Sequence, residues 1–513
     1  MTGNASSGGN NMSQSVPKPR PGTASPGRRE NHHWLVLGVV SLAQLMIVLD
    51  VTIMNIALPS AQHDLGFSND LRQWVVTAYS LAFGSLLLVG GRLADIIGRK
   101  VTFMIGLIGF ASASAFGGAA QNFAMLATGR AIQGMFAALL APSALSLLTI
   151  TFSGTDGRPK AFAIFGAVVG SGAAIGLLLG GVLTEYLNWR WCLYVNLIFA
   201  VIALAGAIVL LPRARGDDPP DLDLPGTVAA VAGLFCVVYG LSNAETHPWS
   251  APQTWAFLAA GVAVLILFVY AEMRAPHPLL PLRIPGDRNR GASYLAVFIT
   301  GAGMFGCFLF LTYYLQDMLN YSPVKTGLAF LPLVAGVMLA AQLSTIVLLP
   351  KLGPQIPVTI GMLLGAAGMM WLTGIHVQGN YPVQVLCPTV LVGLGMGCIF
   401  APAMNIATLG VLPADAGVAS AMVNTCQQVG GSIGIALLSS LASDAVTSYL
   451  TGKRPTRLVQ EQATLHGYTT AFWWSSGIFA AGAVICGLLM RPGKVRPQAA
   501  SGSAGAESVS VML

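Results

Sequence analysis

The chain has 513 residues, of which 54% are hydrophobic and only 9% are charged, and its formal net charge is +7. Soluble proteins carry about 25% charged residues, so this composition excludes a soluble protein and predicts a chain built for a lipid bilayer. Neither a phosphate-binding loop nor a dinucleotide-binding motif occurs in it, so nothing in the sequence suggests ATP as an energy source.

The chain begins with 33 polar residues rich in Gly, Ser, Asn and Pro, which predict a disordered tail. Fourteen apolar stretches follow. Each is long enough to cross the membrane as a helix, because about 20 residues at a rise of 1.5 Å span a hydrocarbon core of about 30 Å. The stretches lack the alternation of barrel strands. We therefore predict an all-α polytopic membrane protein with spans at 34–59, 74–91, 101–120, 124–150, 161–183, 191–211, 225–243, 254–271, 293–315, 326–349, 356–376, 383–405, 417–443 and 470–490.

The distribution of Lys and Arg predicts the orientation. Of the 26 basic residues, 19 fall in segments on the side of the N-terminus and 6 on the opposite side, while Arg130 lies within a span. Cytoplasmic loops carry the excess of positive charge, so both termini are predicted to be cytoplasmic in a multi-pass protein of the inner (cytoplasmic) membrane. The net charge is then a topological signal, and no nucleic-acid partner is expected. The first span is too long for a cleaved signal peptide and predicts an uncleaved anchor.

Two sets of six spans resemble each other. Gly172 and Gly176 in the fifth span match Gly430 and Gly434 in the thirteenth, and the fourth span of each set contains Ala-Pro, as is typical of transporters built from repeats. A chance likeness between glycine-rich spans is the alternative. The predicted organisation is a cytoplasmic tail (1–33), an N-terminal six-helix half (34–212), two inserted transmembrane helices (213–292), a C-terminal six-helix half (293–491) and a second disordered cytoplasmic tail (492–513).

The spans contain only two formal charges, Asp50 and Arg130. A charge in the bilayer costs at least about 2.5–3.5 kcal/mol, so each is a candidate functional residue. Asp50 lies roughly 13 Å and Arg130 roughly 9 Å from the outer ends of their spans, so the two can pair. A static salt bridge is the alternative interpretation. The static interpretation is weakened because buried ion pairs can often be replaced by apolar residues without loss of stability, so a retained pair suggests a functional role.

Candidate cavity residues are neutral. Met46 and Met54 flank Asp50 at i, i+4 and i+8, a stripe that suits a cavity for varied apolar guests but that also arises from ordinary helix packing. The C-terminal half contributes only uncharged polar and aromatic residues, because Asp317 lies just past its span near the outer mouth. A single carboxylate predicts neutral or monocationic substrates. The residues proposed to line the cavity are Met46, Met54, Gln133, Tyr313, Tyr314, Asn424 and Gln427.

A charged turn, GGRLADIIGRK at residues 90–100, interrupts this apolar sequence. Its basic residues enforce cytoplasmic placement. Gly91 and Gly98 are expected to permit a tight reversal and close helix approach, while Asp95 could accept from Arg99 and face a helix N-terminus in the opposite half. A topology marker without a further role is the alternative.

This turn resembles the signature loop of the major facilitator superfamily at Gly91, Leu93, Asp95, Gly98, Arg99 and Lys100, with Ile96 in place of a basic residue. LDVTIMNIALP (49–59), GRAIQG (129–134), WRWCLYVN (189–196) and YYLQDMLNYSPVKTGLAFLP (313–332) are similar to its fourteen-helix drug:proton antiporter branch. The resemblance covers roughly residues 34–490. Its fifth-helix motif is matched at Gly172, Gly176, Gly180 and Gly181, but Leu177 replaces the usual proline, which leaves the kink in doubt. The second copy of the loop is reduced to LPKLG (349–353).

The resemblance implies a multidrug or antibiotic exporter, not an enzyme, that works by alternating access. The turn (Gly91, Asp95, Gly98, Arg99, Lys100) would be a conformational latch that favours one access state. Asp50 would alternate between protonated and ionised forms, with Arg130 favouring the ionised form. The proton gradient would replace any cofactor or metal, and the expected partners are a small amphipathic substrate, protons and lipid, with the protein a monomer. An importer or a metabolite or lipid carrier of the same fold remains the main alternative, and a membrane enzyme would need clustered acids or histidines that the sequence lacks.

Overall fold

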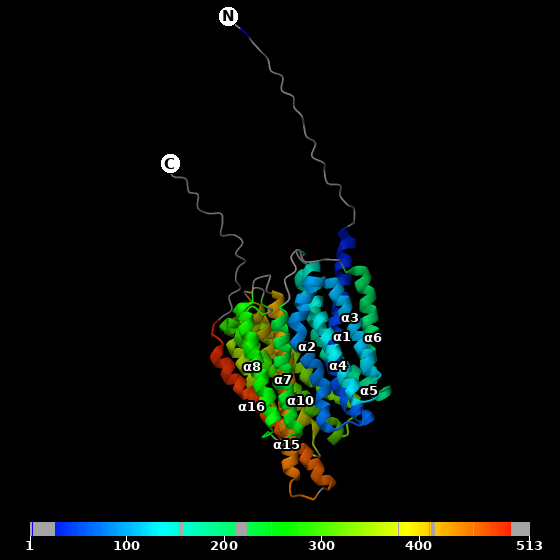
Figure 1. Ribbon diagram of the computed structural model, residues 1–513, viewed down its shortest axis with the longest axis vertical. Helices are drawn as coiled ribbons and strands as arrows, with labels where there is room; N and C mark the ends of the chain where they lie inside the picture. The colour runs from blue at the N-terminus through cyan, green and yellow to red at the C-terminus, as the bar shows by residue number, and fades with distance from the viewer. Residues whose placement is uncertain are drawn as a thin grey trace.

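A computed structural model of the chain describes residues 3 and 26–493, except 153–154, 156, 212–222, 248, 276–277, 279, 378, 410, 412–415 and 455. Within this described part, fourteen helical segments are long and apolar enough to cross a membrane, and they coincide with the fourteen predicted spans (Figure 1). The prediction of an all-α polytopic membrane protein is confirmed. An even number of spans also places both chain ends on one side of the membrane.

The helices are closely spaced, and several spans include a short π-helical segment. Their bounds are α1 Pro26–Leu65, α2 Asn69–Ile97, α3 Arg99–Gly118, α4 Phe123–Thr151, α5 Arg158–Tyr186, α6 Trp191–Leu210, α7 Leu224–Thr246, α8 Pro252–Arg274, α9 Arg283–Gly286, α10 Arg288–Tyr313, η1 Tyr314–Met318, α11 Pro323–Leu343, η2 Ser344–Leu348, α12 Leu349–Leu352, α13 Gln355–Leu372, η3 Pro382–Leu386, α14 Cys387–Thr408, α15 Ala416–Leu450 and α16 Arg457–Leu489.

One part of the predicted N-terminal tail is helical. Helix α1 begins at Pro26, so residues 26–33, which the polar composition predicts to be disordered, are the first turns of the helix. The backbone continues into the long apolar helix without a break, and a polar composition does not prevent a preformed helix from extending. Of the predicted C-terminal tail, residues 494–513 lie outside the described residues.

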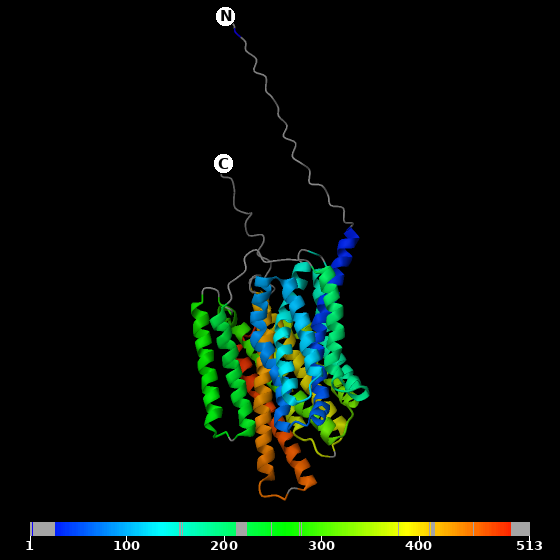
Figure 2. The same ribbon diagram turned by 45° about the vertical axis from the view of Figure 1, so that its right-hand side comes forward.

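The helices before and after the α7–α8 pair form two bundles, here called the first half (α1–α6) and the second half (α10–α16). In the first half α1 packs against α5, and in the second half α10 packs against α15. The halves meet along two seams, where α2 packs on α15 and α5 packs on α11. We call the face at which α1 ends the outer face. At this face α15 and α16 extend beyond the other helices (Figure 2).

The α7–α8 pair covers one of these seams. Figure 2 shows the two helices side by side at the edge of the bundle. Val238 of α7 packs in one apolar cluster with Leu81 of α2 and Ala436 of α15, so α7 contacts both halves at once. Helix α8 points outward and exposes large apolar side chains such as Ile266. The inserted pair therefore lies between the lipid and the α2–α15 seam.

Glycines bring the paired helices together in the same way in both halves. An added Cβ at Gly172 would lie 2.9 Å from Val48 of α1, and one at Gly176 would overlap Thr52 of α1. Gly180 faces the backbone of Ile53 at 2.9 Å. In the second half, a Cβ at Gly430 or Gly434 would overlap a carbonyl oxygen of α10, that of Phe298 or of Ala302 respectively. Small residues of this kind allow helix backbones to approach closely within a membrane.

The fourth glycine of the α5 motif has a different partner. A Cβ at Gly181 would lie 2.7 Å from the carbonyl oxygen of Pro323 and from the Cα of Val324, at the start of α11. Gly181 therefore packs the first half against the second. Leu177, which stands in place of the usual proline, is fully buried, and α5 continues through it as a single helix.

The glycines of the charged turn correct one expectation. Gly98 joins α2 to α3 with a φ of 104°, a conformation that favours glycine, so it permits the predicted reversal. Gly91, however, does not provide the close helix approach, because an added Cβ would meet only Pro142, at 3.8 Å. The close approach is at its neighbour Gly90, where a Cβ would overlap the carbonyl oxygen of Ala138 in α4. One residue along a helix rotates the contact face by about 100°, which sequence alone could not resolve.

Candidate functional site

The two charged residues of the spans meet inside the first half. Asp50 of α1 and Arg130 of α4 are 99% buried, and Arg130 Nη1 donates to Asp50 Oδ2 at 2.5 Å. The pair that the sequence predicted is therefore present. Because both groups are withdrawn from water, each depends on the other for its charge compensation.

The other carboxylate oxygen accepts two neutral hydrogen bonds. Gln133 Nε2 donates to Asp50 Oδ1 at 2.9 Å, and Asn196 Nδ2 donates to the same oxygen at 2.8 Å. Gln133 Nε2 also donates to Ser114 Oγ at 2.6 Å. Four helices, α1, α3, α4 and α6, thus contribute to one buried polar cluster. Among the described contacts of Asp50 are three donors and no acceptor, an arrangement that suits an ionised carboxylate.

Arg130 is held on all sides within the same half. Its Nε donates to the carbonyl oxygen of Val75 at 3.2 Å, and its Nη1 also donates to Gln133 Oε1 at 2.9 Å. The guanidinium carbon lies 4.4 Å from the ring centroid of Tyr79 in α2, a cation–π distance. The arginine is therefore positioned by α2 and α4 as well as by Asp50.

Sequence reasoning missed two members of this cluster, Ser114 and Asn196. Gln133 was included among the cavity residues, whereas the structure places it on Asp50 and fully buried. Asn196 is the last residue of the stretch WRWCLYVN (189–196). A lone asparagine inside an apolar span could have indicated a buried polar contact, because an amide in the membrane needs a hydrogen-bond partner. Ser114 offered no such signal, since serines are frequent in these spans.

Four predicted cavity residues lie in the packed interior instead. Met46 and Met54 are at most 1% exposed and belong to two different apolar clusters, so the stripe around Asp50 reflects helix packing, the alternative that the pattern allowed. Tyr313 and Tyr314 are also buried, and the Tyr314 hydroxyl donates to the carbonyl oxygen of His376 at 2.8 Å. In this conformation these four side chains are buried in the packed core, and the cluster that contains Met54, Tyr313 and Tyr314 includes residues of both halves.

The remaining two candidates lie on α15. Asn424 and Gln427 are partly exposed, near the point where α15 packs on α2 and α10. A Cβ added to Gly84 of α2 would lie 2.9 Å from the Cβ of Gln428. Helices α2 and α15 are therefore closely packed beside Gln427. These two polar side chains therefore remain candidates for contact with a substrate between the halves.

The outer ends of the halves are tied by polar contacts. Arg72 at the start of α2 forms an ion pair with Asp317 of η1 at 3.0 Å, and the Arg72 guanidinium carbon lies 4.1 Å from the centroid of the Tyr313 ring. Gln316 Nε2 donates to the carbonyl oxygen of Ile56 at 3.0 Å. Glu185 of α5 accepts from the backbone N–H of Val324 at 2.9 Å. These contacts join the two halves at the outer face.

Breaking the outer ion pair should loosen the contact between the two halves at the outer face. The Asp317 side chain is 37% exposed, so its pair with Arg72 contributes modestly, and Asp317→Asn should raise the fraction of molecules in which the outer ends of the halves are apart roughly threefold. The measurement is the rate at which a membrane-impermeant thiol reagent, added from the outside, labels a cysteine placed at Ile56. The Ile56 side chain is fully buried, and only its backbone carbonyl accepts from Gln316, so this substitution leaves the other contacts between the halves in place.

A charge exchange, Arg72→Asp with Asp317→Arg, should restore slow labelling. Arg457→Gln serves as the matched control, because its pair with Glu461 lies within α16 and does not join the halves. Equal labelling rates with and without the Arg72–Asp317 pair would show that the contact does not hold the outer ends of the halves together.

The charged turn makes its described contacts near its own end of the bundle. Lys100 Nζ donates to the carbonyl oxygens of Ile208 and Leu211, at 2.8 and 2.7 Å, and so caps the C-terminus of α6. Arg92 Nη2 donates to the carbonyl oxygen of Pro278, in the segment after α8, at 2.7 Å. The side chain of Asp95 lies outside the described residues, so its expected contacts stay a prediction.

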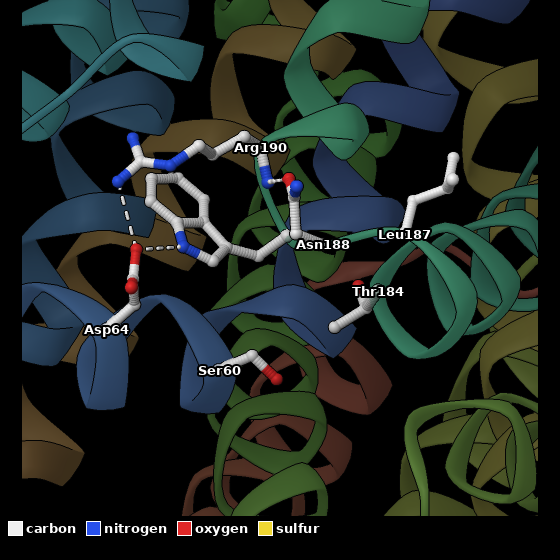
Figure 3. Close-up of a pocket in the computed structure, with 7 residues that line it drawn as sticks. Ser60, Asp64, Thr184, Leu187, Asn188 and Arg190 are labelled. Atoms are coloured by element: carbon white, nitrogen blue, oxygen red, sulfur yellow. Dashed lines mark hydrogen bonds and ion pairs between the residues drawn. The ribbon is translucent and has the colours of Figure 1, made fainter.

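A pocket of about 310 Å³ lies at the outer face, where α1 and α5 end (Figure 3). Asp64 accepts there from Trp189 Nε1 and from Arg190 Nη2, both at 2.9 Å. Arg190 also donates to the carbonyl oxygens of Gly118 and Ala120 at the end of α3. Asp64, Trp189 and Arg190 are thus engaged in contacts that join α1, the end of α3 and the start of α6. None of the predicted site residues lines the pocket.

Comparison with known proteins gives a consistent result. A family model described as the Major Facilitator Superfamily matches residues 40–435. The chain is 46% identical over 459 residues to the puromycin resistance protein pur8 of Streptomyces alboniger, covering 89% of this chain and 91% of that protein. It is 39% identical over 409 residues to the cephamycin export protein CmcT of Amycolatopsis lactamdurans, covering 79% and 84%. The solved structure of the POT family transporter PepTSo is similar with a TM-score of 0.66 at 15% identity, covering 90% of this chain and 97% of that one.

Proposed function

The chain belongs to the major facilitator superfamily, and we propose that it is a proton-coupled antiporter that exports amphipathic drugs or antibiotics across the cytoplasmic membrane by alternating access. It is a membrane transporter and not an enzyme, and its relatives include antibiotic resistance and export proteins. The excess of basic residues supports an orientation in which both termini are cytoplasmic.

The buried Asp50–Arg130 pair is the observation that carries the proposal. An ionisable group at membrane depth is costly, and carboxylates there commonly serve proton relays. Asp50 binds a proton when the space between the two halves is open to the outside, and the proton neutralises the carboxylate and weakens its bond to Arg130. Asp50 releases the proton when the space between the halves is open to the cytoplasm, and the ion pair with Arg130 re-forms. No cofactor is required, since the proton gradient supplies the energy.

Alternating access is supported by the arrangement of the seams. The outer contacts made by Arg72 and Glu185 join the halves on one side. The charged turn, with Asp95 as its acidic residue, acts as the latch on the other side. Lys100 supports this role because it fixes the turn to α6 and so keeps it part of the first half.

The cargo that this site suits is neutral or carries a single positive charge. Asp317, which the sequence places near the outer mouth, forms an ion pair with Arg72, and Asp50 is the one carboxylate within the spans predicted from the sequence. Glu272 of α8 is also buried, but it accepts from the backbone N–H of Leu280. The partly exposed Asn424 and Gln427 offer neutral hydrogen-bonding groups. A dication would leave one charge uncompensated at membrane depth, at a cost of several kcal/mol.

An importer or a metabolite or lipid carrier is the alternative function. The same superfamily fold is compatible with either direction, and the fold shared with PepTSo does not decide between them. The export and resistance named for the relatives favour extrusion. Extrusion in vesicles of known orientation distinguishes the two functions.

Everted membrane vesicles should accumulate a monocationic dye when a proton gradient is imposed, and should accumulate a dicationic dye of similar size at least about tenfold more slowly. The difference follows from the single available carboxylate, because an unpaired charge in the membrane costs more than the 1.4 kcal/mol that corresponds to tenfold. The measurement is the initial rate of dye uptake with and without a protonophore, alongside puromycin as a test cargo.

Vesicles without the protein provide the background, and Asp317→Asn provides the matched variant. Similar rates for both dyes, unchanged by Asp317→Asn, would refute the single-carboxylate model. Gradient-driven loss of cargo from the same vesicles would favour the importer.

A further inference from the structure

Of the two side-chain amides that contact Asp50, that of Asn196 has hydrogen-bond partners at its nitrogen but not at its oxygen. Its Nδ2 donates to Asp50 Oδ1 at 2.8 Å and approaches Ser114 Oγ at 3.4 Å. Its Oδ1 is buried and has no hydrogen-bond partner, in a residue with no exposed surface. A buried carbonyl without a partner is costly and needs an explanation.

Gln133, the other amide on Asp50, is fixed in its orientation. Its Nε2 donates to both Asp50 and Ser114, and its Oε1 accepts from Arg130 Nη1 at 2.9 Å. A half-turn of this amide would set its N–H groups against those of Arg130 and would break three hydrogen bonds. The amide of Asn196 carries no such constraint, because one of its polar atoms lacks a partner in either orientation.

A protonated Asp50 needs an acceptor, and all three described hydrogen bonds of its carboxyl are to donors. The nearby acceptors Gln133 Oε1 and Ser114 Oγ already accept from Arg130 and from the two amides. An ionised carboxylate only accepts hydrogen bonds, whereas a carboxylic acid must also donate one. The titratable groups that face Asp50 are Arg130 of α4, Tyr79 of α2 and Cys192 of α6. Arg130 is a donor, the Tyr79 ring covers that guanidinium, and the Cys192 thiol is engaged with Thr184 at 3.2 Å. The Asn196 carbonyl is one half-turn away from the required position.

We propose that Asn196 is a positioning residue whose side-chain amide rotates by about half a turn when Asp50 binds a proton. This inference rests on the proposed role of Asp50 in proton coupling. In the step, a hydronium ion transfers its proton to Asp50 Oδ1: one O–H bond of the hydronium breaks, the O–H bond of the carboxylic acid forms, and a water molecule is left. The Asn196 Oδ1 accepts from the new hydroxyl in place of the Nδ2 donation. Transfer of the proton to a water molecule on the cytoplasmic side reverses both the protonation and the rotation. Asn196 thus stabilises both protonation states of the carboxyl.

The test is infrared difference spectroscopy of the purified protein in lipid, recorded between high and low pH. One sample carries ¹³C at the side-chain carbonyl of every asparagine, so that no substitution is needed to follow the amide. We expect a carboxylic acid band on acidification together with an amide carbonyl band that shifts with the label. Both bands should disappear in Asp50→Asn, and Asn196→Leu should remove the amide band and displace the acid band, because its hydroxyl then lacks an acceptor.

Transport provides a second measurement. Asn196→Leu, which matches asparagine in shape, should lower proton-driven uptake by roughly tenfold and alter its pH profile, since it removes a hydrogen bond to a charged group. Asn188→Leu is the control, because Asn188 lies exposed in the loop before α6, and the one described hydrogen bond of its side chain is from the backbone N–H of Arg190.

The outcomes separate the inference from the proposed function. An Asp50 acid band without any label-sensitive amide band would overturn the rotation of Asn196 and leave proton coupling intact. The absence of an acid band that depends on Asp50 would overturn proton coupling itself. If Asn196→Leu does not fold, the labelled wild-type protein still decides between the first two results.

Discussion

Replacing Asp50 with Asn is expected to reduce proton-driven transport to the level of vesicles without the protein, because Asp50 is the only acid within the spans predicted from the sequence and is buried against Arg130. The variant keeps an oxygen that can accept from Gln133 and Asn196 but loses the charge that compensates Arg130. Removal of one partner of a buried ion pair costs about 3–5 kcal/mol, so the single variant should also be less stable. Stability is measured by thermal unfolding in detergent, and transport by uptake into everted vesicles.

The double variant Asp50→Asn with Arg130→Gln separates the two effects. It removes both charges and restores an acceptor opposite the new amide, so it should recover most of the lost stability and none of the proton-driven transport. If the double variant transported cargo in response to a pH gradient, Asp50 would not be the proton carrier. If it stayed as unstable as the single variant, the pair would serve the structure beyond charge compensation.

Gly90→Ala should destabilise the protein severely, whereas Gly91→Ala should be tolerated. A Cβ at position 90 overlaps the Ala138 carbonyl oxygen, so α2 and α4 must separate, and overpacking of this kind costs typically 1–3 kcal/mol or more. At position 91 the nearest atom is 3.8 Å away, and alanine favours a helix over glycine by about 1 kcal/mol. Yield and thermal unfolding of the purified variants provide the measurement.

Gly91→Ala is the matched control for Gly90→Ala, because both variants replace a glycine with alanine at adjacent positions of the same helix, α2. Equal losses of stability in both would show that the turn is sensitive to any added methyl group. Equal tolerance would show that α2 and α4 can separate without cost at Ala138.

The sequence could predict the features that depend on composition, and those that depend on rare residues. Fourteen apolar runs gave fourteen spans, because the bilayer sets their length. Asp50 and Arg130 could be paired because no other charges occur in the spans. The predicted reversal at Gly98 followed from its place between two helices, and its φ of 104° agrees with it.

The details of helix faces could not be predicted in the same way. Asn196 and Ser114 reach Asp50 only because α6 and α3 pack beside α1 and α4, and this neighbourhood is a property of the folded bundle. Gly90 and Gly91 are indistinguishable in sequence, although only one faces α4. Met46 and Met54 looked like cavity residues because the stripe beside a charge was clear, whereas the helix that covers it was unknown.

The hydrogen bonds that Asp50 and Arg130 make in the described structure all come from the first half. Substitutions in α10–α16 can therefore change the surface that meets a cargo without replacing any of these partners. Such a division allows the helices that meet a cargo and the helices that hold the buried ion pair to be substituted independently of each other. Two relatives of the chain are named for different antibiotics, puromycin and cephamycin.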